Sequence, residues 1–96
     1  MKNKEVSLER LERGMKHLEA DPRINTWHFS ILIALITFAL KQQSYKHVKV
    51  RRRDVMTLSH IHTLPTYHKY FKELQDFGYI TYRRSYHPGI FSEIDL

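Results

Sequence analysis

The sequence predicts a mainly α-helical domain with a small antiparallel sheet (α+β), and three observations support this class. Apolar residues recur at steps of three and four over residues 6–20 and 64–77, as in helices packed on a core. Residues 79–86 instead alternate apolar and polar side chains, and the turn-forming sequence His87-Pro88-Gly89 follows them. With 96 residues, the chain can form one modest core and bury about two-thirds of its unfolded surface.

The net charge and the composition indicate which classes of partner the protein binds. The formal net charge is +6 and the pI is near 9.7, so we expect an acidic partner, with nucleic acid first and an anionic membrane second. The lack of cysteine excludes disulfides, thiolate zinc sites and thiol nucleophiles, and it fits the cytoplasm as the default location. The apolar run at residues 31–40 is shorter than the roughly 20 residues of a membrane span and too far from the N-terminus for a signal peptide. We therefore expect no membrane association.

The first helix is predicted over residues 6–20, with charged residues on one side and four apolar residues on the other: Leu8, Leu11, Met15 and Leu18. Asp21-Pro22 ends this helix, because the residue before proline is displaced from the α region and the ring has no N–H to donate. We divide the chain at this point. Residues 1–24 are an N-terminal amphipathic helix and candidate dimerisation arm, and residues 25–96 are the main domain.

A second helix is expected from Trp27 to about Tyr45, with Asn25 as its N-cap. The segment lacks proline and glycine, and its apolar residues occupy nearly the whole circumference of the helix. One face of a small domain cannot cover so much apolar surface. We expect one side to pack on the core and another on the first helix or a second subunit, and a homodimer is the favoured way to bury it.

A short strand and a short helix are predicted next. Residues 47–50 alternate polar and apolar side chains like a strand. Arg51-Arg52-Arg53-Asp54 then leads into a helix with three residues facing inward: Val55, Leu58 and Ile61. A turn at residues 59–62 follows.

Thr63 can cap the next helix, which accommodates Pro65 in its first turn, runs to about Phe77 and ends at Gly78. Its inward face is predicted to hold Leu64, Tyr67, Phe71 and Leu74, with Tyr70 and Phe77 at the margins. The opposite face holds Pro65, Lys69, Lys72 and Asp76, flanked by Thr66, His68 and Glu73.

A hairpin completes the predicted fold, with residues 79–86 as the first strand and residues 90–96 as the returning strand. Ile80 and Tyr82 share one side of the first strand. The returning strand puts Ile90, Ile94 and Leu96 on one face. From Asn25 onward the order is helix, short strand, helix, turn, helix and hairpin, which is the winged helix-turn-helix arrangement, here with an extra N-terminal helix.

This arrangement predicts how the protein meets DNA. The second helix of the helix-turn-helix pair enters the major groove and contacts bases mainly through its N-terminal part. Thr66, His68 and Lys69 are therefore candidates for base edges, and Lys72 is a candidate for a phosphate. The arginines at 51–53 open the first helix of the pair, where backbone amides also favour anions. The full set of candidate DNA-binding residues is Arg51, Arg52, Arg53, Thr63, Thr66, His68, Lys69, Lys72, Arg83, Arg84, Tyr86 and His87.

The distribution of charge agrees with this surface. Residues 41–87 contain ten basic and three acidic residues, whereas the two ends of the chain are nearly balanced or acidic. Each feature taken alone has a plainer explanation. An arginine run is more often a solvated charge cluster, and tyrosines more often pack in a core than stack on bases. The combination favours double-stranded DNA as the partner.

Other functions are less well supported by the residues. The chain shows no pair of carboxylates, Ser-His-acid set or phosphate-binding loop, so we expect no enzymatic activity, no cofactor and no small-molecule substrate. His60-Ile61-His62, with His68 downstream, suggests a metal site, but its alternating spacing in a turn without an acidic or cysteine partner argues against one. The alternative function is a protein-interaction module, with a structural winged helix and the apolar second helix as the partner surface.

Two stretches of sequence, at residues 54–59 and 66–80, resemble small winged-helix DNA-binding proteins that are often encoded on transferable genetic elements. The resemblance extends over residues 25–96 and includes Ser85-Tyr86-His87-Pro88. It implies DNA binding by the helix at residues 66–72 and by the wing, without a catalytic residue. The implied role is a transcriptional regulator or an accessory factor for excision or transfer of a mobile element. Two departures are Arg51, where a Ser or Thr cap is usual, and a short wing tip around Gly89.

Overall fold

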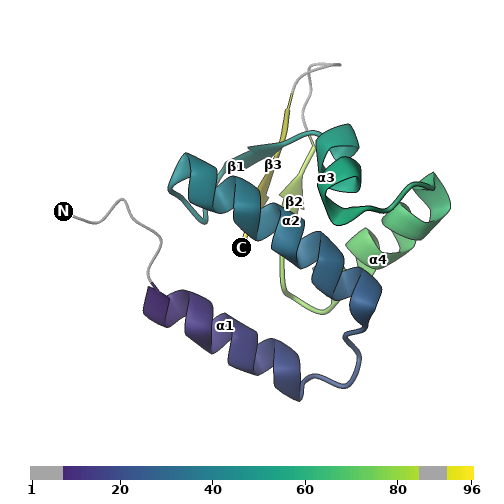
Figure 1. Ribbon diagram of the computed structural model, residues 1–96. Helices are drawn as coiled ribbons and strands as arrows, with labels where there is room; N and C mark the ends of the chain where they lie inside the picture. The colour runs from purple at the N-terminus through teal and green to yellow at the C-terminus, as the bar shows by residue number, and fades with distance from the viewer. Residues whose placement is uncertain (1–7, 85–90) are drawn as a thin grey trace.

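The computed structural model of the protein describes residues 8–84 and 91–96. Over these residues the chain forms four helices and a three-stranded antiparallel sheet (Figure 1), which confirms the predicted α+β class. The elements are α1 (Leu8–Ala20), α2 (Thr26–Gln42), β1 (Val48–Val50), α3 (Arg52–Ser59), α4 (Leu64–Asp76), β2 (Thr81–Arg83) and β3 (Ser92–Asp95). None of the helices in these ranges is long and apolar enough to cross a membrane.

The sheet has the order β1-β3-β2, so the last strand lies between the other two. Ile94 of β3 pairs with Val48 of β1 and with Tyr82 of β2, and Ile94 and Val48 are fully buried. The side-chain amide of Gln42 closes the outer edge of β1. Its Nε2 donates to the carbonyl of Lys49 at 2.8 Å, and its Oε1 accepts from the Lys49 amide at 2.9 Å. This side chain satisfies backbone groups that would otherwise be open to another strand.

Helix α2 lies at the centre of the core, where it contacts α3, α4 and β1. Figure 1 shows it crossing the middle of the molecule, with α1 below it. Ile31 and Leu35 on its inner side are fully buried, in one cluster with Leu74 of α4 and Ile94 of β3. Burying each side chain of this kind contributes about 1.5–3 kcal/mol. The apolar side chains of α2 therefore pack against several other elements and stabilise their arrangement.

The N-terminus of α2 has the cap that the sequence predicts. The Asn25 side chain accepts hydrogen bonds from the amides of Trp27 and His28, at 2.9 and 3.3 Å. In return, the amide of Asn25 donates to Nδ1 of His28 at 3.0 Å. The pair forms a capping box in which a histidine occupies the position usually held by Glu or Gln.

The C-terminus of α2 and the start of β1 differ from the prediction. The helix ends at Gln42 rather than near Tyr45, because Gln43 adopts a left-handed backbone conformation with φ of 56°. His47 is also left-handed, with φ of 54°, so β1 begins one residue later than predicted, at Val48. Neither position carries the Gly or Asn that usually marks such a conformation in a sequence.

Two leucines that were predicted to face the core are exposed. Leu58 is 40% exposed and Leu64 is 43% exposed. Val55 and Ile61 are buried as predicted, and Ser59 rather than Leu58 shares the inward side of α3 with Val55. Ser59 is small enough for its carbonyl to approach α2, where it accepts a hydrogen bond from the Ser30 hydroxyl. Leu64 is the first residue of α4, so no preceding turn of this helix covers it.

Helix α1 is attached to the rest of the chain by apolar contacts and by a hydrogen-bonded carboxylate. Leu18 is part of the core cluster, and Met15 packs against it. Just after α1, the carboxylate of Asp21 accepts a hydrogen bond from the Tyr79 hydroxyl at 2.7 Å and two from the Arg23 side chain. Burial and the bond to Asp21 raise the pKa of Tyr79 to about 12. These contacts join the link between α1 and α2 to the residues that precede β2.

Substitution by alanine is expected to change stability in opposite directions at Gly14 in α1 and at Gly78 in the turn after α4. Gly78 has φ of +88°, a conformation that costs an L-residue about 1–2 kcal/mol, so Gly78→Ala should destabilise the fold by about 1 kcal/mol. Gly14 is inside a helix, and a Cβ there meets no atom within 4 Å. Gly14→Ala should therefore stabilise the fold by about 0.5–1 kcal/mol. Urea unfolding of both variants measures these changes, and shifts of the same sign would contradict this view of the two positions.

Candidate nucleic-acid interface

The outer face of α4 forms the centre of the candidate interface. Tyr67, Phe71 and Leu74 attach the helix to the core, at 4%, 7% and 0% exposure. The opposite side is exposed to solvent and carries the residues that the helical spacing places there: Pro65, Lys69, Lys72 and Asp76. Of the flanking residues, His68 is exposed, and Thr66 and Glu73 are half-buried. This orientation leaves a polar face with two lysines available to a partner.

The first turn of α4 agrees with the prediction in position but not in bonding. Thr63 is the N-cap residue, and Pro65 lies within the first turn. The Thr63 hydroxyl, however, donates to the hydroxyl of Thr66 at 2.8 Å and makes no side-chain bond to a backbone amide. The amides of this turn therefore keep the partial positive charge of a helix N-terminus, which favours a nearby anion.

Both lysines of α4 have neighbours that orient them without burying them. The Nζ of Lys69 lies 5.1 Å from the centre of the Tyr70 ring, and this ring stacks on Trp27 at 6.0 Å. The Nζ of Lys72 lies 3.4 Å from a carboxylate oxygen of Asp76. An exposed pair of this kind contributes about 0–1 kcal/mol, so a phosphate can replace the carboxylate at little cost.

The arginines at the start of α3 are exposed, and one of them contacts the segment before β3. The guanidinium of Arg51 is 4.4 Å from the centre of the Phe91 ring, just before β3, and its side chain makes no capping bond. Burial raises the pKa of the Tyr67 hydroxyl on α4, and the positive charge of Arg52 acts in the opposite direction. Arg52 and Arg53 are exposed. The start of α3 thus carries exposed positive charge next to the segment that leads into β3.

Arg83, a predicted DNA contact, is engaged within the hairpin. Its Nη1 and Nη2 donate to the two carboxylate oxygens of Asp95, at 3.0 and 2.7 Å, and its Nε lies 3.6 Å from Glu93. The bond to Asp95 raises the pKa of Arg83, and the guanidinium holds the pKa of Asp95 well below its usual range. A DNA phosphate would have to compete with both carboxylates. The guanidinium therefore joins β2 to β3 in the free protein.

Of the other three predicted hairpin contacts, Arg84 lies within the described residues and Tyr86 and His87 do not. Arg84 directly follows β2 and is exposed to solvent. Tyr86 and His87, which were predicted to contact DNA from the tip of the hairpin, lie outside the described residues. Arg84 is thus the described hairpin residue best placed to meet a partner.

The ion pair of the hairpin predicts a loss of stability in acid. Hydrogen bonds from the Arg83 guanidinium and from the His47 amide hold the pKa of Asp95 well below its usual range. A carboxylate of this kind stabilises the folded state above its unfolded pKa of about 3.9, and the contribution disappears as the pH falls below that value. The Tm of the protein should therefore fall between about pH 4 and pH 2. Asp95→Asn should lower the Tm near neutral pH and make the acid transition shallower, and an unchanged profile would contradict this role.

Sequence reasoning missed one buried contact beneath the interface. His28 is 1% exposed, and its Nε2 lies 2.7 Å from a carboxylate oxygen of Glu73 on α4. Because Nδ1 accepts from the Asn25 amide, the ring proton is on Nε2, which donates to Glu73. The ring of His28 also meets Tyr70 edge-on at 5.0 Å. The sequence Asn25-Thr26-Trp27-His28 has the capping-box spacing, which was the one available signal for this residue.

The remaining histidines do not form a metal site in the part of the chain that the structure describes. His60, His62 and His68 are exposed, and His60 has a left-handed backbone with φ of 61° at the end of α3. Within residues 8–84 and 91–96, no group of three or more His, Asp or Glu side chains could hold a metal ion.

Comparison with known proteins found no relative of this chain. No family model, no curated protein and no solved structure matches the chain. The assignment of function therefore depends on the fold and on the side chains described above. Two features carry it: the exposed basic side of α4 and the arginines at the start of α3.

Proposed function

We propose that the protein is a winged helix-turn-helix protein that binds double-stranded DNA. The order of elements from α2 onward and the strand order β1-β3-β2 support this assignment. In this proposal α3 and α4 are the helix-turn-helix pair, and β2 and β3 are the arms of the wing. Helix α4 enters the major groove, and the start of α3 lies against the phosphate backbone.

The observation that carries the proposal is the exposed side of α4 with Lys69 and Lys72, opposite the side that is buried in the core. The exposed arginines at residues 51–53 lie at the start of α3, and Arg51 contacts Phe91 next to β3, so positive charge also lies at the start of the other helix of the pair. A groove that receives α4 would bring its phosphates toward this run. Arginine suits this role because its guanidinium makes paired hydrogen bonds to phosphate oxygens.

In this proposal, the part of the DNA that each residue contacts depends on its position in the fold. Base edges would be contacted from the first half of α4, and phosphates from its second half and from α3. In this proposal Thr66, His68 and Lys69 contact bases, whereas Arg51, Arg52, Arg53, Thr63 and Lys72 contact phosphates or sugars. Arg84, Tyr86 and His87 act from the wing, and Arg83 braces it through Asp95.

Two biological roles fit the same binding chemistry. A transcriptional regulator would favour one palindromic operator, whereas an accessory factor for excision or transfer of a mobile element would bind several neighbouring sites and bend the DNA. Both roles are the ones that the sequence resemblance at residues 54–59 and 66–80 implies. The spacing of bound sites in a nuclease-protection experiment on the neighbouring DNA distinguishes them.

Backbone NMR of the labelled protein during titration with a short duplex tests the proposed surface. The amide signals of Thr63, of α4 residues 64–72 except Pro65, and of residues 51–53 should shift on binding. Signals of the outward side of α1 should stay in place and serve as the internal control. Shifts confined to α1 and α2 would contradict the proposal.

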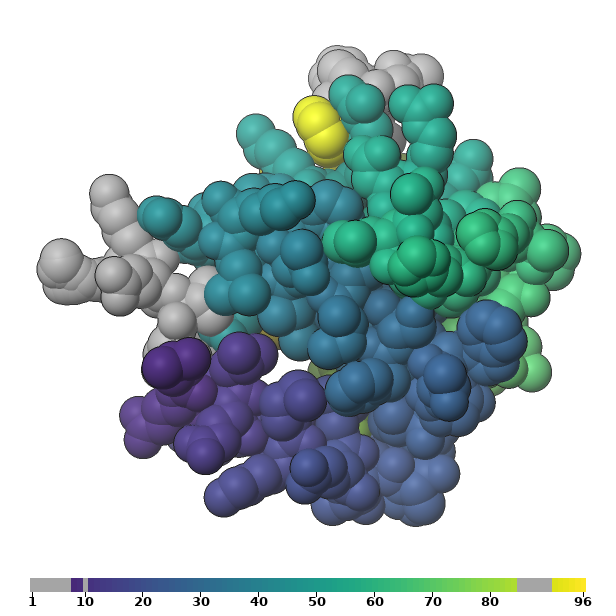
Figure 2. Space-filling view, in the orientation of Figure 1, coloured from purple at the N-terminus to yellow at the C-terminus, as the bar shows by residue number. Residues whose placement is uncertain are grey.

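A homodimer is part of the proposal, because α2 keeps an exposed apolar face. Phe29, Ile33 and Leu40 lie at steps of four and seven on one side of the helix and are 38%, 42% and 48% exposed. Figure 2 shows α2 across the face of the molecule in view, between α1 and α3. Two copies joined through this face could present two α4 helices to a symmetric site on DNA.

Sedimentation velocity at tens of micromolar protein tests the dimer. Ile33→Glu should produce monomers, because a carboxylate at the centre of an apolar contact loses its hydration without gaining a partner. Lys41→Glu, on the exposed polar end of the same helix, should leave the dimer intact. An unaltered protein that sediments as a monomer at these concentrations would contradict the dimer.

The same apolar face favours one alternative function, a protein-interaction module in which the winged helix is structural. In that case another protein would cover Phe29, Ile33 and Leu40, and the basic side of α4 would have no duplex to meet. The DNA titration distinguishes the two functions, since only the first predicts shifts in α4.

A further inference from the structure

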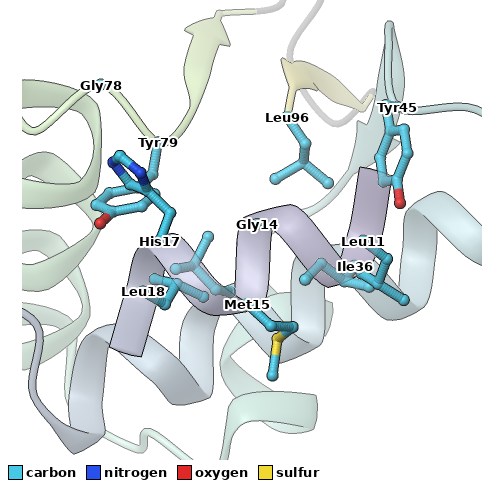
Figure 3. Close-up of a pocket in the computed structure, with 11 residues that line it drawn as sticks. Leu11, Gly14, Met15, His17, Leu18, Ile36, Tyr45, Gly78, Tyr79 and Leu96 are labelled. Atoms are coloured by element: carbon cyan, nitrogen blue, oxygen red, sulfur yellow. The ribbon is translucent and has the colours of Figure 1, made fainter. Parts of the chain in front are cut away.

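A pocket between α1 and the main domain takes no part in the proposed DNA contact. Its volume is about 210 Å³, and it is partly open to solvent. Figure 3 shows His17 and Tyr79 at one end of it, and Leu11, Ile36 and Tyr45 at the other. The lining comes from segments far apart in sequence: α1, α2, Tyr45 after α2, the segment around Gly78 and Tyr79, and Leu96.

Gly14 explains why this space is not filled by the protein. At about 100° per residue, Gly14 shares the inward face of α1 with Leu11 and Leu18. A Cβ at this position would meet no atom within 4 Å. Gly14 lines the pocket and is itself exposed, so the helix contributes no side chain at this point of the lining.

The lining restricts the chemistry of a ligand. Most of the lining side chains are apolar, among them Met15 and Leu32, and none of the described lining residues is Lys, Arg, Asp or Glu. A charged molecule would lose hydration there without gaining an opposite charge. His17 lies at one end, with its ring edge-on to Tyr79 at 5.9 Å, and an imidazole nitrogen can bond one hydroxyl or carbonyl of a ligand.

The volume restricts the size of the ligand. In another protein, an apolar cavity of about 150 Å³ lined by Leu, Ile and Phe holds benzene. A pocket of about 210 Å³ is larger by an amount that suits a second fused ring. A longer or branched molecule would extend through the open side into solvent.

We propose that this pocket binds an uncharged, mostly apolar small molecule of about the size of two fused rings, with one polar group directed toward His17. The site is separate from the proposed DNA-binding surface, and its existence does not depend on DNA binding. It lies beside Gly78 and Tyr79, which connect α4 to β2.

Methyl NMR with 2-naphthol as the probe tests the site. In protein with ¹³C-labelled methyl groups, addition of 2-naphthol should cause saturable shifts at Leu11, Met15 and Ile36. The methyl groups of Val55, which is fully buried on the other side of α2, should not shift and are the control. Nuclear Overhauser contacts between the naphthol ring and the Met15 methyl should appear in the unaltered protein. Their absence, or shifts that do not saturate, would overturn the proposal.

Two substitutions at Gly14 separate filling of the pocket from strengthening of the helix. Gly14→Leu places a side chain in the gap and should weaken 2-naphthol binding by about tenfold or more. Gly14→Ala adds only a Cβ in open space and should keep the affinity within about threefold of the original. Circular dichroism checks that each variant folds. If Gly14→Leu binds 2-naphthol as tightly as the unaltered protein does, the ligand is not in this pocket and the proposal is wrong.

Discussion

Replacing Lys69 and Lys72 together with alanine should lower the affinity for duplex DNA by at least about tenfold while the protein stays folded. Both side chains are exposed on the outer side of α4 and contribute nothing to the core. A lost base contact at Lys69 would cost about 1–3 kcal/mol and relax sequence preference, whereas a lost phosphate contact at Lys72 would weaken binding to all sequences alike. Fluorescence anisotropy with specific and random duplexes measures the two effects.

The matched control for this double variant is on α1. Arg13→Ala with Lys16→Ala removes the same two positive charges from exposed helix positions that lie away from α4. This control should change DNA affinity only slightly, through the lower net charge. Equal losses in both double variants would show that net charge alone governs binding and would contradict the assigned surface.

His28→Ala should lower the free energy of unfolding by about 3 kcal/mol. The substitution removes a buried ring that accepts from the Asn25 amide, donates to Glu73 and packs against Tyr70 and Phe77. It leaves both a cavity and polar groups without their partner. Chemical unfolding at constant pH measures the change.

An exposed histidine of the same chain provides the control for His28. His62→Ala changes the same side chain at an exposed position and should alter stability by less than about 0.5 kcal/mol. If His28→Ala cost no more than His62→Ala, the hydrogen bonds of His28 to α4 and to the N-cap would have no structural importance.

The repeating patterns in the sequence predicted the elements that position the interface. Tyr67, Phe71 and Leu74 follow the helical period, so the exposure of Lys69 and Lys72 could be predicted from spacing alone. The cap at Asn25 and the end of α4 before Gly78 were also visible, because Asn and Gly are the residues that these positions usually require.

Local patterns failed where the backbone departs from what the residue type indicates. Gln43, His47 and His60 adopt left-handed conformations without being Gly or Asn, so the ends of α2 and α3 and the start of β1 carried little signal. Leu58 continues the helical period of α3 but is exposed, because the short helix turns Ser59 toward α2.

Contacts between distant segments could not be read from the sequence. The sequence predicts Arg83 as a DNA contact of the wing, but the register of β2 and β3 places it opposite Glu93 and within reach of Asp95. His28 and Glu73 are 45 residues apart and meet only because α2 crosses α4. Each partner is polar and unremarkable in its own segment, so only the tertiary structure identifies the pair.

Equilibrium binding of the purified protein to duplex DNA across a salt titration tests the central claim most directly. The protein should bind duplex from its own genetic neighbourhood more tightly than random-sequence duplex. The logarithm of its affinity should fall linearly as the logarithm of salt concentration rises, because basic residues release counterions from phosphates. Failure to bind either duplex at low salt would contradict DNA binding and leave the apolar face of α2 as the surface to pursue.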